Sequence, residues 1–230
     1  LCATGLLMAS AVTVHAEDTM HTIYTTGTAK ISIPADMATF QVTVDSRADN
    51  ASAASSANAM TMAKVRRAVI AAGANVSRLE TTGYSVSPEY RYEKNGKSVL
   101  TGYRAHNVLK VQVDNVRITG KVMDAAVDAG ASYVDSVSFG LKDPAMYQDR
   151  ALAIATKSAL RKATVMAQAV GKRVISTVSL YDQSNNEEPT VQYRTMKLVA
   201  ADNAAVRQET SLEPTEQEIT ASVGATFQIN

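Results

Sequence analysis

Apolar and polar residues alternate near both ends of the chain, with the period of two that is typical of half-buried β-strands. In residues 21–33 the small and apolar side chains fall on odd positions, and after Pro34-Ala35-Asp36 the alternation resumes from Ala38 to Val44. This pattern predicts two strands that pair as a β-hairpin. Residues 219–229 are apolar at every odd position and predict a strand that closes the chain.

A second period, close to 3.6 residues, predicts three helices. Each follows a capping residue and ends at a glycine: Asp49 or Asn50 to Gly73, Asp114 or Asn115 to Gly130, and Asp143-Pro144 to Gly171. The third is about 40 Å long at 1.5 Å per residue. The inward stripes are Met62, Val65, Val69 and Ala72; Ile118, Val122 and Ala126; and the alanine-rich set Leu152, Ala155, Ala159, Ala163, Met166 and Val170.

The segment Lys94-Asn95-Gly96-Lys97 predicts a two-residue hairpin turn, because Asn-Gly readily takes the positive φ angles of a type I′ turn. Pro88 cannot donate to a ladder and is expected at an edge or a bulge. The turn sets a register in which four pairs face each other: Tyr92 with Val99, Tyr90 with Thr101, Pro88 with Tyr103, and Val86 with Ala105.

A strand is also expected after the second helix, with Tyr133, Val137, Phe139 and Leu141 on one side, and another from Val174 to Tyr181. The order of elements predicts an α+β fold: a mainly antiparallel sheet covered on one face by two long helices and one shorter helix. Residues 17–230 are expected to form a single domain. The polar segment 182–217 is expected to be a loop or arm, and such long loops are usually functional or mobile.

Residues 1–16 are uncharged, lean apolar and end in Val14-His15-Ala16, which predicts a signal peptide cut after Ala16. Because the chain opens at Leu1 with no basic residues before the apolar run, this signal peptide is expected to be partial. Cleavage would remove Cys2 and leave no thiol for a disulfide. No apolar run reaches the roughly 20 residues that a membrane span requires, so an exported protein that does not span a membrane is expected.

Composition changes this picture little. The 230 residues are 46% apolar and 20% charged with a net charge of +1, which favours a globular protein. That net charge supplies no broad field for nucleic acid or anionic lipid. Basic residues recur on two helices, at Lys64, Arg66 and Arg67 and at Arg150, Lys157 and Arg161; such rows are most often solvated faces and less often partner surfaces.

Candidate chemistry is sparse. Ser85 falls opposite His106 in the predicted register, but a serine nucleophile also needs an acid that orients the base, and an oxyanion hole in a pocket. After cleavage only His21 and His106 remain as histidine ligands, without a short-spaced metal cluster. No phosphate-binding loop or dinucleotide motif is present. The prediction is therefore that the chain has no catalytic, cofactor-binding or metal-binding residues.

Four tyrosines share one face of the predicted hairpin: Tyr84, Tyr90, Tyr92 and Tyr103. This arrangement favours core or subunit packing over a ligand groove.

Taken together, the chain resembles the SIMPL-domain family of bacterial envelope proteins, a domain of unknown function. The matching segments are Gly27-Thr28-Ala29, Pro34 to Ala38, Thr81 to Tyr90, Gly102 to Asn107, Gly130, Val134 to Phe139, and the helix Ala151 to Gly171 with Ala151, Ala155, Ala159, Lys162, Ala163 and Ala167.

The resemblance implies a periplasmic or outer-membrane-associated protein of a Gram-negative bacterium, similar to oxidative-stress-defence and periplasmic immunogenic proteins. Some relatives are similar to ring-like oligomers, and the family supplies no catalytic residues. The leading hypothesis is a non-enzymatic envelope protein that self-assembles or binds an envelope protein partner. The alternatives are a channel-forming or small-molecule-binding periplasmic module, and a hydrolase that uses Ser85 and His106.

Overall fold

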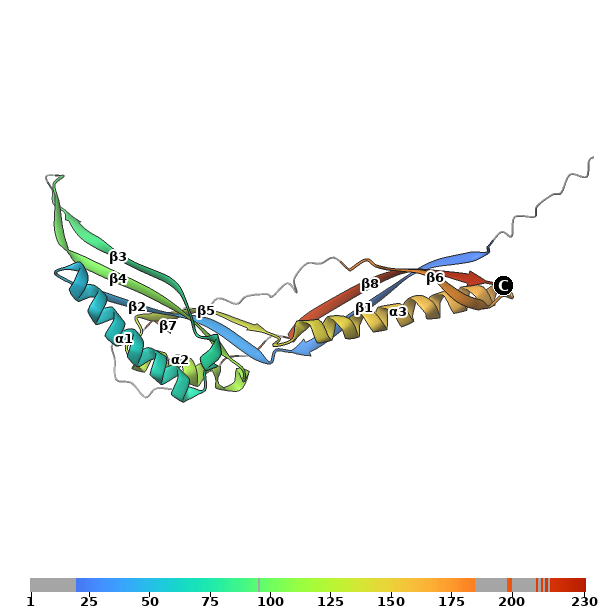
Figure 1. Ribbon diagram of the computed structural model, residues 1–230, viewed down its shortest axis with the longest axis horizontal. Coiled ribbons are helices and arrows are strands. Elements are labelled where there is room, and N and C mark those ends of the chain that lie inside the picture. Colours follow the sequence, from blue (N-terminus) through green and yellow to red (C-terminus); the bar gives the residue numbers. More distant parts are fainter. Residues whose placement is uncertain are drawn as a thin grey trace, which may run out of the picture. The chain divides into compact units, whose positions relative to one another are not determined.

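The computed structural model describes residues 20–94, 96–184, 198–199 and 216–230, together with residues 210, 212 and 214. Within these ranges the chain forms two compact units (Figure 1). Unit 1 contains residues 20–29, 152–184 and 221–230, and unit 2 contains the remaining described residues. Three elements have residues in both units: strand β1 (Thr22–Pro34), helix α3 (Pro144–Ala169) and strand β8 (Glu216–Ile229).

Unit 1 is a three-stranded sheet with one helix packed on it. The strands lie in the order β1-β8-β6, so that β1 and β6 (Val174–Asp182) are the edges, and β6 runs antiparallel to β8. The predicted alternation is confirmed in both β1 and β8. Thr25 and Ala29 of β1 are buried, as are the odd positions of β8 from Ile219 to Phe227.

Small residues let α3 lie directly on this sheet. Ala155, Ala159 and Ala163 are fully buried, and a Cβ atom on Gly27 would lie 1.9 Å from the carbonyl oxygen of Ala155. The Oγ1 of Thr25 donates a hydrogen bond to the carbonyl oxygen of Ala159 at 2.9 Å. The helix and strand β1 are thus in backbone contact, which larger residues at these positions would prevent.

The predicted stripe of α3 is correct from Ala155 to Ala163 and wrong at both ends. Leu152 is only half-buried, and its neighbour Ala151 is the fully buried residue. Met166 and Val170 are exposed, and Ala167 is buried in their place. The buried alanines from Ala155 to Ala167 are spaced four residues apart. Because the helix has 3.6 residues per turn, each of them is rotated by about 40° around the helix axis relative to the one before it. Such a drifting stripe follows a twisted sheet better than a straight one does.

Unit 2 is a five-stranded sheet with two helices on one face. The strand order is β3-β4-β2-β5-β7, and each neighbouring pair is antiparallel. The elements are β2 (Met37–Ala48), α1 (Ala51–Ala72), β3 (Glu80–Tyr92), β4 (Ser98–Val113), α2 (Thr119–Asp128), β5 (Tyr133–Gly140) and β7 (Leu198–Val199), with short 3₁₀ turns at Val76–Arg78 and Val116–Ile118.

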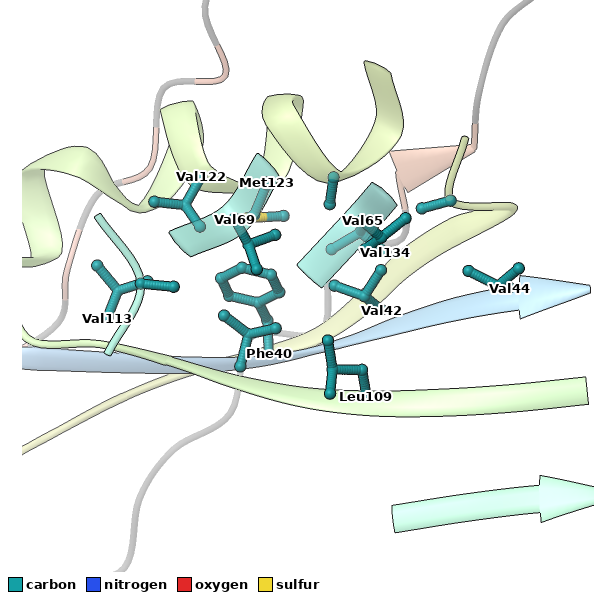
Figure 2. Packing of buried hydrophobic residues seen from close by; sticks show 14 of the residues in the cluster. Phe40, Val42, Val44, Val65, Val69, Leu109, Val113, Val122, Met123 and Val134 are labelled. Atoms are coloured by element: carbon teal, nitrogen blue, oxygen red, sulfur yellow. The ribbon is translucent and has the colours of Figure 1, made fainter. Parts of the chain in front are cut away.

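The core of unit 2 lies between this sheet and the two helices. Figure 2 shows Phe40 of β2 directed toward Val69 of α1 and Met123 of α2. All three are almost completely buried, and full burial of a side chain of this size contributes roughly 1.5–3 kcal/mol. The apolar residues that sequence periodicity assigned to α1 and α2 therefore face this core.

The predicted ends of α1 and the predicted start of α3 are confirmed by hydrogen bonds, but the predicted start of the second helix is wrong. The side chain of Asn50 accepts from the backbone N–H of Ala53 at 2.8 Å, and Gly73 ends α1 with a φ of 115°. Asp143 accepts from the backbone N–H of Met146 at 3.2 Å at the start of α3. These positions follow from side-chain chemistry within one turn of the chain, which explains why local sequence was sufficient. By contrast, Asn115 caps the 3₁₀ turn Val116–Ile118 through the N–H of Arg117, and α2 begins only at Thr119, without a side-chain cap.

The predicted hairpin between the first two strands is wrong. β1 belongs to the three-stranded sheet, whereas β2 pairs with β4 and β5. The residues between them are held by β5: the backbone N–H of Asp36 donates to the carbonyl oxygen of Gly140 at 3.0 Å, and its carboxylate accepts from the N–H of Lys142 at 2.8 Å. The chain therefore passes from one sheet to the other instead of folding back.

The β3–β4 register is confirmed in its middle and wrong at its tip. Pro88 faces Tyr103 as predicted, but Tyr92 faces Ser98 and Tyr90 faces Leu100. A bulge after Glu89 leaves Thr101 as an extra residue, and the backbones of Glu93 and Lys97 close the loop. Asn95 lies outside the described residues, so the predicted type I′ turn is not described, but its two-residue length is wrong.

A second bulge changes which side chains of β5 face the core. Between Thr39 and Gln41 of β2, two residues of β5 oppose one, and Ser136 takes a positive φ of 54°. The inward residues are consequently Val134 and Val137, and the prediction that Tyr133 shares the side of Val137 is wrong. One extra residue reverses the alternation along a strand.

The α+β class is confirmed, with antiparallel pairing and three α-helices in the described part of the chain. The helices are divided between the two sheets. The single domain over residues 17–230 stays a prediction, and the signal peptide at 1–16 lies outside the described residues. Most of the predicted arm at 182–217 also lies outside the described residues. Of its described residues, Leu198–Val199 pair with β5, and the hydroxyl of Thr210 donates a hydrogen bond to the carboxylate of Asp124 at 2.8 Å.

Candidate functional site

Polar side chains cross the face of the five-stranded sheet that lies opposite α1 and α2. Asp45 of β2 faces His106 of β4, and His106 faces Ser85 of β3. Since alternate residues of a strand share a face, Arg104 and Arg47 lie two positions further on the same side. The sheet register thus brings together side chains that are about 20 to 60 positions apart in the sequence.

Asp45 is the centre of this network. Its carboxylate accepts a hydrogen bond from Arg104 at 2.5 Å and contacts the Nδ1 of His106 at 2.8 Å. Its backbone N–H donates to the Oγ of Ser132 at 2.8 Å. The Asp45 side chain is 13% exposed, against 31% for His106 and 36% for Arg104. A largely buried carboxylate is therefore shared by two cationic or polar partners.

The environment shifts two pKa values in this network. Burial raises the pKa of Asp45, but hydrogen bonds from Arg104 and His106, and then the charges of these two groups, outweigh burial and leave the pKa below its ordinary value. The hydrogen bond to Asp45 raises the pKa of Arg104. Asp45 is thus held as the anion that orients both neighbours.

A second ion pair lies beside this network. The Nε of Arg47 donates to both carboxylate oxygens of Glu89, at 3.0 and 2.9 Å. The Arg47 side chain is 64% exposed, and exposed pairs of this kind contribute little to stability. The pair links β2 to β3 across β4.

The predicted register places Ser85 opposite His106 correctly, and the structure adds the acid that sequence reasoning missed. Asp45 was detectable, because it has the opposite parity to Val42 and Val44 and so must lie on the polar face of β2. However, Ser85 is exposed, and within the described residues its hydroxyl makes no hydrogen bond to His106. The carboxylate is also shared with Arg104. This arrangement positions an imidazole without supplying an activated nucleophile.

The bulge between β2 and β5 borders a surface depression of about 430 Å³. Its lining includes the polar residues Thr39, Ser138 and Lys110 together with Phe40 and Val137, and the hydroxyls of Thr39 and Ser138 are 2.6 Å apart. Ser136, with its positive φ, lies on the rim. Backbone strain of this kind often accompanies binding sites.

Asn58 is a further residue that the sequence reading passed over. It is fully buried in α1, and its side-chain amide donates to the carbonyl oxygens of Val44 and Ala105, at 2.8 and 3.2 Å. Asn58 lies four residues before Met62, so helical spacing places it in the inward stripe. A buried amide needs hydrogen-bond partners, and this position was therefore a detectable signal in the sequence. Asn58 joins α1 to two strands and has a structural role.

The tyrosine face is not core. Tyr84, Tyr90 and Tyr92 are each more than half exposed and Tyr103 is half-buried, so among the described residues the predicted core packing is wrong for the first three. Packing of these rings against another subunit stays a prediction. The hydroxyls of Tyr84 and Ser55 of α1 are 2.7 Å apart. Figure 1 shows the tip of the β3–β4 hairpin extending beyond α1.

Among the described residues, no three His, Cys, Asp or Glu side chains come together as a metal site. In the same ranges, no helix has the length and hydrophobicity to cross a bilayer.

Comparison with known proteins identifies the family of this chain. Residues 23–227 match the model of the SIMPL family, described as a protein of unknown function, DUF541. The uncharacterized protein YggE of Escherichia coli K12 is 28% identical over 212 residues, which cover 90% of this chain and 82% of that protein. The 26 kDa periplasmic immunogenic protein of Brucella melitensis is 28% identical over 215 residues, which cover 90% and 84%. YggE of Edwardsiella ictaluri is 29% identical over 172 residues, which cover 75% and 72%.

Proposed function

Because the chain belongs to the SIMPL family, whose function is unknown, we propose that it is a non-enzymatic periplasmic protein of the cell envelope that assembles with copies of itself. The word periplasmic in the name of the Brucella relative supports the location. The open setting of Ser85 and His106 supports a role without catalysis. The association with oxidative stress defence is proposed from the family resemblance alone.

One observation carries the assembly proposal: strand β6 is an exposed apolar edge. Among the described residues it is an outer strand of the three-stranded sheet, and all its side chains except those of Val174 and Ser179 are exposed. Ile175, Leu180 and Tyr181 of this strand are 58%, 52% and 60% exposed. An edge strand also presents backbone N–H and C=O groups that can form hydrogen bonds with a strand of another chain.

β6 carries few of the features that keep edge strands apart. Such strands usually carry lysine, proline, inward charges or β-bulges. The sequence VISTVSLYD has no charge before Asp182 and no proline, and bulges are the one feature of this group that β6 has. Its two irregular positions are Ile175 and Val178, which the register with β8 skips. Both are large, apolar and about half exposed.

A second copy of the chain is the occupant that fits this edge best. Two identical strands can pair antiparallel about a twofold axis, and each then supplies what the other lacks. The same contact would bury the exposed side chains of β6 at about 25 cal/mol per Å² of apolar area.

The test compares two leucines of similar exposure on different strands. Leu180 of β6 is 52% exposed and Leu100 of β4 is 47% exposed. We expect the full chain to show the mass of an oligomer by light scattering, Leu180→Lys to reduce it toward a single chain, and Leu100→Lys to leave it unchanged. A concentration-independent single-chain mass for the unaltered protein would contradict assembly. If only Leu100→Lys reduced the oligomer mass, the subunit contact would be assigned to the β3–β4 hairpin, which would contradict the role of β6.

A further inference from the structure

The basic residues of this chain are unevenly distributed between the two units. Among the described residues of unit 1, the only acidic side chain is that of Asp182, whereas the basic side chains are Lys157, Arg161, Lys162, Lys172 and Arg173. The near-zero net charge of the whole chain conceals this excess. The prediction that charge supplies no field for anionic lipid therefore does not apply to unit 1 taken by itself.

Two of these five cations lie on the face of α3 that points away from its sheet. Lys157 and Arg161 are exposed and one turn apart, on the opposite side of the helix from Ala155 and Ala159. Neither forms an ion pair within the described residues. Positive charge on this face is therefore available to an external anion.

Large apolar side chains lie among these cations. Ile154 and Val165 are on the same face of α3 and are 41% and 57% exposed. A helix that merely covers a sheet exposes polar residues on its outer face. Here the outer face combines long cationic side chains, whose charged ends can reach outward, with aliphatic side chains between them.

Beside this face, α3 and the edge strand β1 border a depression of about 440 Å³. It is lined by Tyr24, Thr26, Arg161 and Val165, among others. Lys162 is held there by a 2.6 Å hydrogen bond to the carbonyl oxygen of Thr26. The depression thus offers a cationic rim, hydroxyl groups and an apolar wall within one small volume.

We propose that the outer face of α3, together with this depression, binds the surface of an anionic phospholipid bilayer. A headgroup phosphate would lie at Arg161, Lys157 would add a second contact, and Ile154 and Val165 would enter the boundary between headgroups and acyl chains. A polyanion without an apolar part would use the cations but gain nothing from the aliphatic residues. This surface is separate in sequence and chemistry from the β6 edge that is proposed for assembly.

The experiment is co-sedimentation of the full chain with vesicles. We expect binding to vesicles of phosphatidylethanolamine and phosphatidylglycerol, little binding to vesicles of phosphatidylcholine alone, and weaker binding as salt rises. Lys157→Gln combined with Arg161→Gln should weaken binding on the order of tenfold or more, since each cation near such a surface contributes about 1 kcal/mol. The matched control, Lys64→Gln combined with Arg67→Gln on α1, should bind like the unaltered protein.

Two further arms separate the bilayer from other anions. Ile154→Ser combined with Val165→Ser keeps every charge and should still weaken vesicle binding. Inorganic phosphate should compete no better than chloride at equal ionic strength. The proposal would be overturned if the α3 glutamine variant and the α1 glutamine variant bound vesicles equally well, or if the serine variant bound like the unaltered protein. It would also be overturned by specific competition from phosphate, or by retention on heparin without vesicle binding.

Light scattering and circular dichroism on the same variants keep this result distinct from the assembly proposal. An α3 variant that loses vesicle binding and keeps both its mass and its helix content supports lipid binding. A variant that loses vesicle binding only together with its mass would assign α3 to subunit contact and overturn the lipid proposal.

Discussion

At the scale of single residues, the polar face of unit 2 depends on the charge of Asp45. This carboxylate is ionised beside Arg104 and His106, and its pKa is lowered by them against the effect of burial. A group whose pKa is lower in the folded chain stabilises the fold above its unfolded pKa, and this contribution is lost as the pH falls through the folded value.

Asp45→Asn should therefore lower the free energy of unfolding at neutral pH by roughly 1 kcal/mol. This is less than a fully buried ion pair would lose, because solvent screens the partly exposed Arg104. The difference from the unaltered protein should shrink as the pH falls below the ordinary aspartate pKa of 3.8. Urea unfolding at several pH values measures it, and Asp149→Asn, an exposed carboxylate on α3, is the control. A loss that is the same at every pH would show that the charge of Asp45 is not the cause.

At the scale of elements, unit 1 depends on the contact between the backbones of β1 and α3. Gly27 is the critical position, because an added Cβ would lie 1.9 Å from the carbonyl oxygen of Ala155 and 2.5 Å from the backbone nitrogen of Ala159. Neither atom can move without displacing the helix. The alanine stripe is the matching feature on α3.

Gly27→Ala should destabilise the protein by about 1–3 kcal/mol or more, as expected for an overpacked contact. Gly83→Ala on β3 is the matched control, since its Cβ would lie 3.6 Å from the Val108 side chain, an ordinary contact. Denaturant unfolding of both variants provides the comparison. Equal stability of the two would refute the close packing of β1 against α3.

At the scale of the whole molecule, β1, α3 and β8 each contribute residues to both compact units. Unfolding one unit would disrupt strands and a helix that the other unit also uses. We therefore expect the two units to unfold cooperatively, as the single domain predicted from the sequence requires.

Scanning calorimetry should show one transition in which the calorimetric and van't Hoff enthalpies agree. Gly27→Ala, which acts in unit 1, should shift that transition as a whole. Two transitions, of which Gly27→Ala moves only one, would show that the units fold independently and would refute the single domain.

The sequence by itself determined the three helices and all the strands except β7, the ends of α1, the start of α3, and most of the inward faces. Asn50, Gly73 and Asp143 act through bonds within one turn of chain, and the periods of α1 and β8 follow from burial of one side. It also showed that Ser85 lies opposite His106, because the middle of the β3–β4 hairpin kept the predicted register.

The tertiary structure alone decided which distant strands pair and where a strand gains a residue. β1 joins β8 rather than β2, and the bulge at Ser136 reverses the faces of β5. Both outcomes depend on long-range packing, which local periodicity does not record. For the same reason, only the folded chain joins Asp45 to Arg104 and His106 and gathers the cations of α3 in a unit whose described residues contain one acidic side chain.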